Sequence, residues 1–397
     1  LLQKIKKATD VDWDGEGKYF VLPIHLEGGQ SQGFYGEGEI LPRSEPQVGD
    51  RFLIYTKAMA FTVAITRQNI LAIKQGPGAF FNSKAHEIEE NTISLREKMS
   101  RAFGGDGQGV LGILAANATV GGGVTTLTFT SDTNMQHFRK GMYIDVWAPA
   151  YPVVGRRVGS DAADNLLYDK GWKITAVNRA ARTVTFTGDG TAVDAMVAGD
   201  YVLPENEGIG LNGATGNLAH GKEFTGLQAL FSTGQFWPSL QGLAYATYPE
   251  LQAPRDTAGA DRPLSVNLLE KMANDISVSS DKDVDFIWLD HFQHRTLLAS
   301  GLQDVRHVSE KVKLGYTQMT WNGKSFYLDR QAPPGKCFLG SMECLGRAVL
   351  AEMGPFDGPM GERTPRYAVT EWAFGADMNI FNRQPNGGGW LENLTKS

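Results

Sequence analysis

The chain has 397 residues and a formal net charge of −6 at pH 7, with 42% hydrophobic and 21% charged residues. This balance is too apolar for intrinsic disorder and fits a folded protein of about two or three domains. The acidic charge argues against a chain that wraps nucleic acid, because such chains gain affinity by neutralising phosphates. The 47 glycines predict many turns and strand ends.

Cysteine usage and hydropathy exclude further classes of protein. Cys337 and Cys344 are too few for a disulfide scaffold or a zinc site, so we expect two buried thiols in a reducing compartment. No run of about 18 apolar residues occurs, so we expect no membrane-spanning segment and no membrane partner. The chain begins at Leu1 with neither an initiator Met nor a signal peptide. We therefore expect that upstream residues were cleaved or lie outside this sequence.

Residues 1–16 are polar and predict an N-terminal arm rather than a packed element. Asp10, Asp12 and Asp14 match the start of an EF-hand calcium loop. The twelfth position of that loop should be a bidentate Glu, but Val21 stands there, and no helices flank the segment. The pattern therefore indicates an acidic, solvated turn and no calcium site.

Residues 17–66 predict an extended β-hairpin. Its two β-type runs are Tyr19–Leu26 and Phe52–Ile65, the second of which alternates apolar and small polar residues. The intervening segment 27–50 carries six glycines and two prolines. A long loop of this kind cannot pack a core of its own, so we expect another subunit to support it.

A long amphipathic helix is predicted from Ser83 to the glycines after Phe103. Apolar residues recur at helical spacing on one face: Ile88, Thr92, Leu95, Met99 and Ala102/Phe103. Asn82 and Ser83 are good N-caps, and Glu97 precedes Arg101 by four residues, which favours a helix. About 20 residues give a rod of roughly 30 Å. The apolar face of this helix needs a surface to pack against, and the opposite face suits solvent or neighbouring chains.

Residues 117–207 are rich in Thr, Val and Gly and contain an internal repeat. Thr126–Thr130 recurs as Thr183–Thr187, and Gly141–Val146 recurs as Gly199–Leu203. Repeated strand pairs with glycine turns predict a small β-barrel or sandwich that is inserted as a unit.

The rest of the chain predicts mixed structure, so the fold class is α+β. A helix is expected over 264–276, residues 354–366 form a loop, and the tail is Gly/Asn-rich. Between these lie a buried strand, a short helix, further strands and a long final strand: Phe286–Leu289, Asp290–Leu298, Gly315–Asp329, Lys336–Leu339 and Tyr367–Phe381.

The sequence carries no motif for catalysis or cofactor binding that withstands inspection. Gly105–Gly109 looks like a phosphate loop, but it follows a helix, whose negative end repels phosphate. His291 and His294 beside Asp290 have a ligand-like spacing without a third ligand nearby, so surface or capping roles are expected. We expect no enzyme, no catalytic site, no cofactor and no metal site.

The order of these parts resembles the major capsid proteins of tailed phages with the Hong-Kong-ninety-seven-type fold. Short stretches typical of that family occur in the matching order along most of the chain: Gly38–Pro42, Phe61–Ile70, Gly105–Leu111, Gly226-Leu227, Trp237-Pro238, Phe326–Asp329, Pro333–Gly335 and Asp377–Arg383. No single stretch is specific, and the resemblance depends on their order.

The resemblance implies a division of the chain into an N-terminal arm, an extended loop, a peripheral domain built on a spine helix, an inserted β subdomain, a connecting segment, an axial domain, and a return strand with the C-terminal tail. The corresponding ranges are 1–16, 17–66, 67–116, 117–207, 208–262, 263–357 and 358–397. The inserted subdomain is not part of the minimal fold, and we expect it to be a surface or axial decoration.

The resemblance also implies function and partners. The chain is expected to form hexamers and pentamers of an icosahedral shell around double-stranded DNA, bound without sequence specificity. Portal, scaffold and cement proteins are further implied partners, and the implied location is the virion, after assembly in the bacterial cytoplasm. In some relatives an isopeptide bond between a Lys and an Asn side chain links neighbouring subunits covalently, and the lysine lies on the extended loop. No lysine lies between Lys18 and Lys57, so we expect no such crosslink and salt bridges through Arg43 and Glu45 instead.

Two other interpretations remain. An encapsulin-like nanocompartment shell would share the fold and carry cargo enzyme in place of DNA. A β-rich carbohydrate-active protein or lectin would use an aromatic cleft, with Trp147, Trp172 and Trp237 as candidates.

Overall fold

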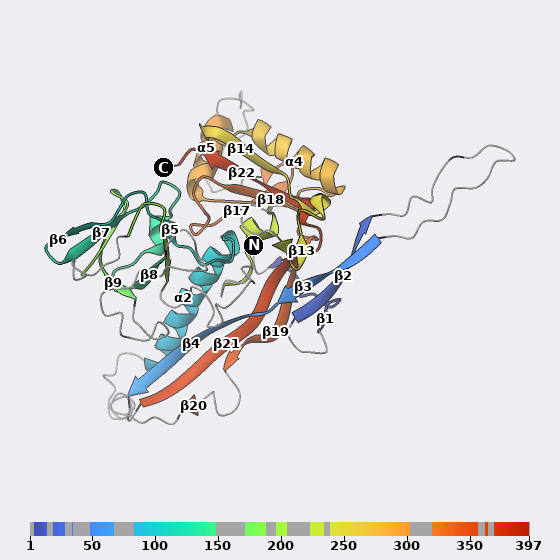
Figure 1. Cartoon of the computed structure of the whole chain (residues 1–397). Helices are drawn as coiled ribbons and strands as arrows, with labels where there is room; N and C mark the ends of the chain where they lie inside the picture. The colour runs from blue at the N-terminus through green and yellow to red at the C-terminus, as the bar shows by residue number, and fades with distance from the viewer. Residues whose placement is uncertain are drawn as a thin grey trace, which may run out of the picture.

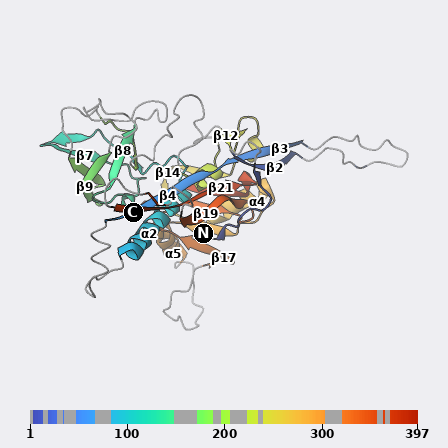
Figure 2. The same cartoon turned by 90° about the horizontal axis from the view of Figure 1, so that it is seen from below.

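The structure, a computed structural model, describes residues 4–13, 19–27, 34, 48–66, 83–147, 171–187, 196–204, 223–233, 239–301, 320–355, 362–363 and 369–396. Over these residues the chain is α+β with sheets predominating, as expected (Figure 1). The described body is elongated, with a small β-barrel at one end and the β2–β3 hairpin at the other (Figure 2). Within the described part of the chain, no helix has both the length and the apolarity to cross a bilayer.

The predicted hairpin forms from β2 (Tyr19–Glu27) and β3 (Val48–Tyr55). The strands are antiparallel, with Phe20 opposite Ile54 and Leu22 opposite Phe52, and these four side chains are buried. The prediction of one strand over 52–65 was wrong. The run divides at Thr56, and the second part, β4 (Lys57–Thr66), pairs with a strand from the other end of the chain. The tip of the hairpin, with Arg43 and Glu45, lies outside the described residues.

The N-terminal arm is packed, contrary to the sequence prediction. Ile5 is 2% exposed and belongs to the main core. Two backbone hydrogen bonds join the segment to a distant strand, from Ala8 N–H to the carbonyl of Arg347 (3.0 Å) and from Arg347 N–H to that of Lys6 (3.1 Å). Further along the same segment, the short strand β1 (Asp12–Trp13) pairs with β2. One apolar residue among charged ones carries no periodic signal, so only the tertiary pairing identifies this contact.

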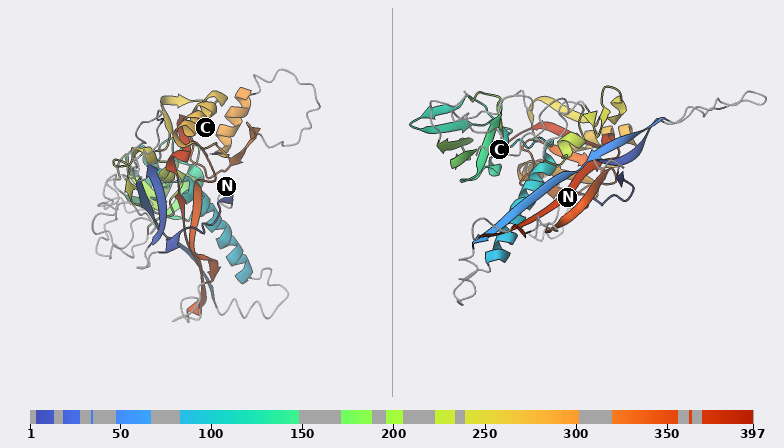
Figure 3. Two further views of the ribbon diagram at one scale, coloured as in Figure 1. Left: turned by 90° about the vertical axis from the view of Figure 1, so that its right-hand side faces the viewer. Right: turned by 60° about the horizontal axis from the view of Figure 1, so that its bottom comes forward.

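One part of the body joins a long sheet to a long helix (Figure 3). Strand β21 (Val369–Asn382) lies between β19 (Leu345–Pro355) and β4, and also pairs with β20 (Glu362–Arg363). The predicted helix is α2 (Ser83–Gly104), 22 residues long, which lies beside β4. Its start and end agree with the sequence prediction, and β19 was not foreseen.

A second part of the body is a mixed six-stranded sheet with α4 (Val266–Ser280) packed on it. The strand order is β14 (Arg255–Arg262), β22 (Gly388–Leu394), β18 (Cys337–Gly340), β15 (Phe286–Leu289), β17 (Lys324–Leu328) and β16 (Thr320–Trp321). Leu269, Met272 and Ile276 of α4 are fully buried. Helix α5 (His291–Gly301) follows β15 directly, as predicted.

The Gly/Asn-rich tail is a strand inside this sheet, which corrects its prediction as a tail. Strand β22 pairs with β14 on one side and β18 on the other, and Trp390 is fully buried. A Cβ at Gly388 would lie 2.3 Å from the Phe231 ring, and one at Gly389 would lie 2.6 Å from the Pro254 carbonyl oxygen. The glycines therefore permit close packing, although in sequence they suggest a loop.

The inserted region is a small closed barrel with its own core. Its strand order is β5 (Gly112–Ile113), β11 (Tyr201–Pro204), β8 (Tyr143–Trp147), β9 (Trp172–Asn178), β10 (Thr183–Thr187), β7 (Val124–Thr128) and β6 (Thr119–Gly121). A β-bridge between Leu114 and Phe129 closes the ring from β5 to β7. β5 lies before the predicted start of the module at residue 117.

The internal repeat of the sequence explains the barrel's pairing. The two Thr-rich copies are β7 and β10, which pair with Val184 opposite Leu127. The two copies that follow glycine are β8 and β11, which pair with Val202 opposite Val146. Each repeated strand therefore lies beside its own copy.

Short elements complete the described chain. They are α3 (Leu227–Leu230), β12 (Ser239–Leu240), β13 (Leu243–Ala244), and the 3-10 turns Met135–His137, Pro249–Leu251 and Pro385–Gly387. Leu227 and Leu230 of α3 are fully buried in the main core.

Candidate assembly surfaces

The β2–β3 hairpin is fixed at its root and leaves the body beyond it. The side-chain amide of Asn379 on β21 donates to the carbonyl of Tyr55 at 2.7 Å. Tyr248 O–H donates to Asp50 at 2.8 Å and lowers the pKa of that carboxyl. Outward from Leu22, the side chains of Pro23 and His25 are exposed. The hairpin therefore projects a two-stranded ribbon away from its own core, as Figure 1 shows.

Helix α2 is most deeply buried at its C-terminal end. Ala102 and Phe103 are buried, and the Phe103 ring meets that of Trp288 edge-on at 5.5 Å. Further back, Ile88 and Leu95 are half-buried as the sequence predicted, while Ile93 is 43% exposed. The N-terminal turns thus present a broad face that the described body leaves open.

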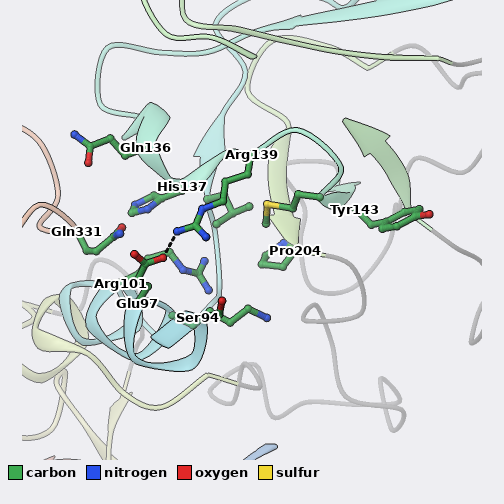
Figure 4. Close-up of a pocket in the computed structure, with 12 residues that line it drawn as sticks. Ser94, Glu97, Arg101, Gln136, His137, Arg139, Tyr143, Pro204 and Gln331 are labelled. Carbon is green, nitrogen blue, oxygen red and sulfur yellow. Dashed lines mark hydrogen bonds and ion pairs between the residues drawn. The ribbon is translucent and has the colours of Figure 1, made fainter. Parts of the chain in front are cut away.

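Helix α2, the barrel and the loop after β17 meet at one ion-paired junction (Figure 4). Glu97 accepts hydrogen bonds from Arg139 of the barrel and from Arg330 of the loop after β17. Arg101 pairs with Glu223, and both side chains are nearly buried. The sequence had indicated Glu97 with Arg101 as a helix-stabilising pair, whereas both residues bind partners far away in the chain.

The histidine of this junction, His137, stays uncharged. Burial and the neighbouring Arg101 lower the pKa of His137 to about 3. The imidazole is therefore neutral across the physiological range, and the ion pairs carry the charge of the junction. A cavity of about 350 Å³ opens here between the helix and the barrel.

The structure places the described residues of the acidic segment and of the glycine turn. Asp10 is paired with Arg383, and Asp12 lies in β1, so the acidic segment is not a solvated turn. Asp14 lies outside the described residues. In the Gly105–Gly109 turn, Asp106 accepts the Gln108 N–H, and the turn glycines 107 and 109 have positive φ, as a tight structural turn requires.

Asp290, His294 and the two cysteines contact or lie within the folded body. Asp290 caps α5 by accepting the Gln293 N–H at 2.7 Å, and the His294 ring packs edge-on against Phe326. Among the described residues no group of three potential metal ligands occurs. Cys337 and Cys344 are buried free thiols, as expected, and burial raises the pKa of Cys344 to about 11.

The two aromatic candidates that the structure describes, Trp147 and Trp172, lie on opposite faces of their sheet. Trp172 lies opposite the inward-facing Ile144 and packs on Phe186, with ring centroids 5.0 Å apart. Trp147 stands three residues after Ile144 on the same strand, so it points to the opposite face. Trp237 lies outside the described residues.

No family model and no curated protein matches this sequence. A chain of the cyanophage A-1(L) capsid asymmetric unit is similar in structure, with a TM-score of 0.55 at 8% identity, covering 99% of this chain and 91% of that chain. A chain of Gordonia phage Cozz (TM-score 0.49, 11% identity, 100% and 86% covered) and the capsid of an empty GTA particle (0.49, 7%, 99% and 90%) are further matches. The predicted phage capsid fold is therefore confirmed: over nearly its whole length, this chain has the fold of the cyanophage A-1(L) capsid chain.

Proposed function

We propose that this chain is the major capsid protein of a tailed phage, and that it assembles through hexamers and pentamers into an icosahedral shell around double-stranded DNA. The observation that carries the proposal is the likeness in fold, over 99% of the chain, to a chain of the cyanophage A-1(L) capsid. The virion is then its location, after assembly in the cytoplasm of a bacterial host.

The shape of the protomer supports this function. Strands β2 and β3 leave the core after Leu22, and the N-terminal turns of α2 present an uncovered face. A spread-out protomer of this kind can bury more surface between chains than a globule can. Obligate interfaces reach about 2,000–5,000 Å². A chain whose ribbon lies on a neighbour gains that area at each contact.

The remaining parts of the proposal concern partners. Portal, scaffold and cement proteins are the expected partners of such a shell, and DNA is enclosed without base readout. The barrel has its own core, separate from that of the body, and fits a decoration added to the shell subunit. The division into arm, extended loop, peripheral, inserted, connecting, axial and return segments at the predicted boundaries belongs to the same proposal.

The first test is the size of the expressed protein. Sedimentation and negative-stain imaging should show closed particles of megadalton mass, and particles from infected cells should contain double-stranded DNA. A folded monomer that stays monomeric under all assembly conditions would refute the proposal. Particles that hold a protein cargo would identify the nanocompartment instead, and a small oligomer that binds glycans would identify the lectin.

A second test removes the extended loop alone. Replacing residues 28–47 by an Asn-Gly turn joins β2 to β3 directly. The variant should fold with wild-type circular dichroism and fail to form particles, because the ribbon no longer reaches a neighbour. A matched control replaces 148–170, between β8 and β9, by a short Gly/Ser linker and should still assemble. Normal particles from the 28–47 variant would contradict the role given to the hairpin.

A further inference from the structure

A group of arginines gathers on the barrel side of the α2 junction. Arg139 follows the 3-10 turn of the barrel, Arg179 lies in the β9–β10 turn, and Arg330 lies in the loop after β17. With Gln136 and Gln331, these three side chains line one cavity of about 290 Å³, called here the arginine pocket. Segments far apart in the chain thus bring three guanidiniums to one small space.

The positive charge of the arginine pocket is only partly balanced. Glu97 is the acidic side chain at its edge, and its two carboxylate oxygens each accept one bond, from Arg139 and from Arg330. Arg179 is exposed and has no hydrogen-bond or ion-pair partner among the described residues. Each guanidinium carries more N–H donors than the single one that Glu97 engages. Donors and charge therefore exceed what the described residues supply.

The neighbouring surface has the same sign. The adjoining cavity shares Gln136, Arg139 and Gln331 with the arginine pocket and is also lined by Lys98 and Arg101 (Figure 4). Arg101 is already paired with Glu223. A chain with a formal net charge of −6 thus carries a local basic hollow. Local positive potential of this kind attracts anions in spite of the overall charge.

We propose that the arginine pocket binds a phosphate group. Planar guanidiniums donate paired hydrogen bonds to the oxygens of phosphate, and arginine is the side chain best suited to such recognition. A tetrahedral oxyanion can accept bonds from three directions at once, which a single carboxylate cannot do. Arg179 supplies the unused charge, and Gln136 and Gln331 supply uncharged donors. The bound phosphate joins the barrel to the loop after β17, beside the ion pairs that Glu97 forms with Arg139 and Arg330.

The phosphate can be a free ion or part of a nucleic-acid backbone, and two titrations distinguish these sources. Isothermal calorimetry of the purified full-length chain, in a phosphate-free buffer of low ionic strength, uses inorganic phosphate in one arm and a short DNA duplex in the other. Saturable binding in either arm that depends on Arg179 supports the proposal and identifies the source. No saturable binding in both arms overturns it.

Two matched variants make the test specific. Arg179→Gln removes the unpartnered guanidinium and should weaken binding by about tenfold, as expected for the loss of a charged hydrogen bond. Lys140→Gln removes an equal charge from an exposed residue next to Arg139 that does not line the pocket, and should change affinity by less than about twofold. Equal losses in the two variants would mean general charge attraction and would overturn the site.

Thermal unfolding gives an independent readout. A ligand that binds the folded chain raises its melting temperature. Phosphate should therefore raise the melting temperature of the wild type and of Lys140→Gln, and leave that of Arg179→Gln nearly unchanged. Without phosphate, Arg179→Gln should melt like the wild type, because its side chain has no described partner to lose. A phosphate effect of the same size in all three proteins would overturn the proposal.

Discussion

The side chain of Asn379 and the backbone carbonyl of Tyr55 form a hydrogen bond of 2.7 Å that fastens the root of the β2–β3 hairpin to β21. Asn379 is 4% exposed, and its side-chain oxygen Oδ1 also accepts a hydrogen bond from the Thr225 N–H at 2.9 Å. One amide thus joins three segments that are far apart in the sequence. The proposed contact of this hairpin with a neighbouring subunit needs such an anchor, because force on the hairpin is transmitted to its root.

The first prediction concerns this anchor. Asn379→Ala leaves the carbonyl of Tyr55 and the N–H of Thr225 without this partner, and each abandoned buried group costs about 1–3 kcal/mol. Urea unfolding should therefore show a clear loss in the free energy of unfolding. Asn386→Ala, which removes an exposed bond to the Ser279 carbonyl, is the control and should change stability by about 0.5 kcal/mol or less. Equal effects of the two substitutions would argue against the anchor.

The second prediction concerns the orientation of the barrel. Glu97→Gln removes the charge that Arg139 and Arg330 share, and hydrogen exchange should become faster near residues 134–142 and 330–332. Both arginines are more than half exposed, so global stability should fall by about 1 kcal/mol at most. Glu89→Gln, on the exposed face of the same helix, should leave exchange unchanged. Unaltered exchange in Glu97→Gln would show that the junction does not hold the barrel.

The third prediction concerns the glycine turn before strand β8 of the barrel. Gly141 has φ +85°, and a Cβ there would meet nothing within 4 Å, so any cost of alanine comes from the backbone alone. Gly141→Ala should destabilise the barrel by about 1–2 kcal/mol. Gly121→Ala, in equally open space, should cost less. Tryptophan fluorescence during thermal unfolding reports the barrel through Trp147 and Trp172, and equal midpoints for both variants would contradict the argument.

The fourth prediction concerns pH and the N-terminal segment. The hydrogen bond from Arg383 lowers the pKa of Asp10 below its usual value. The stabilisation is therefore complete above about pH 4 and is lost as the pH falls through the lowered pKa. Asp10 is 47% exposed, so the effect is local. The protection factor of residues 4–13, which is the exchange rate of an unstructured chain at the same pH divided by the observed rate, should fall on acidification in the wild type and be low at every pH in Asp10→Asn. A wild-type protection factor that does not change with pH would contradict the prediction.

The fifth prediction concerns covalent bonds between subunits. No lysine lies between Lys18 and Lys57, so the loop cannot supply the amine of an isopeptide bond. Assembled particles should give a single band of monomer mass on denaturing electrophoresis after boiling. A ladder of higher bands would show that the subunits are crosslinked.

Some elements were predictable from sequence because their signals are local. Helix α2 has its apolar period, its start at Ser83 and its glycine stop within one stretch. Strand β15 was found with its correct bounds, because Phe286–Leu289 is a continuous apolar run. The repeat in the barrel predicted strand pairs, since copies of one unit tend to pack in the same way. The fold resemblance followed from the order of these elements.

The sequence could not predict the surfaces that matter for assembly, because these depend on pairings between distant segments. Asn379 and Glu97 are ordinary polar residues until folding brings Tyr55 and Arg330 to them. The side chains of the arginine pocket come from two turns of the barrel and from the loop after β17, and no spacing in the sequence relates them.

The local elements and their order follow from the amino-acid sequence, since backbone propensity, capping and hydrophobic period act over a few residues. Contacts across the whole chain divide the run 52–65 between two sheets, bury Ile5 in the core and make the glycine-rich end the buried strand β22. Strand partners are chosen by packing and hydrogen bonding across the whole chain, and a strand's own residues do not encode which neighbour will complete its ladder.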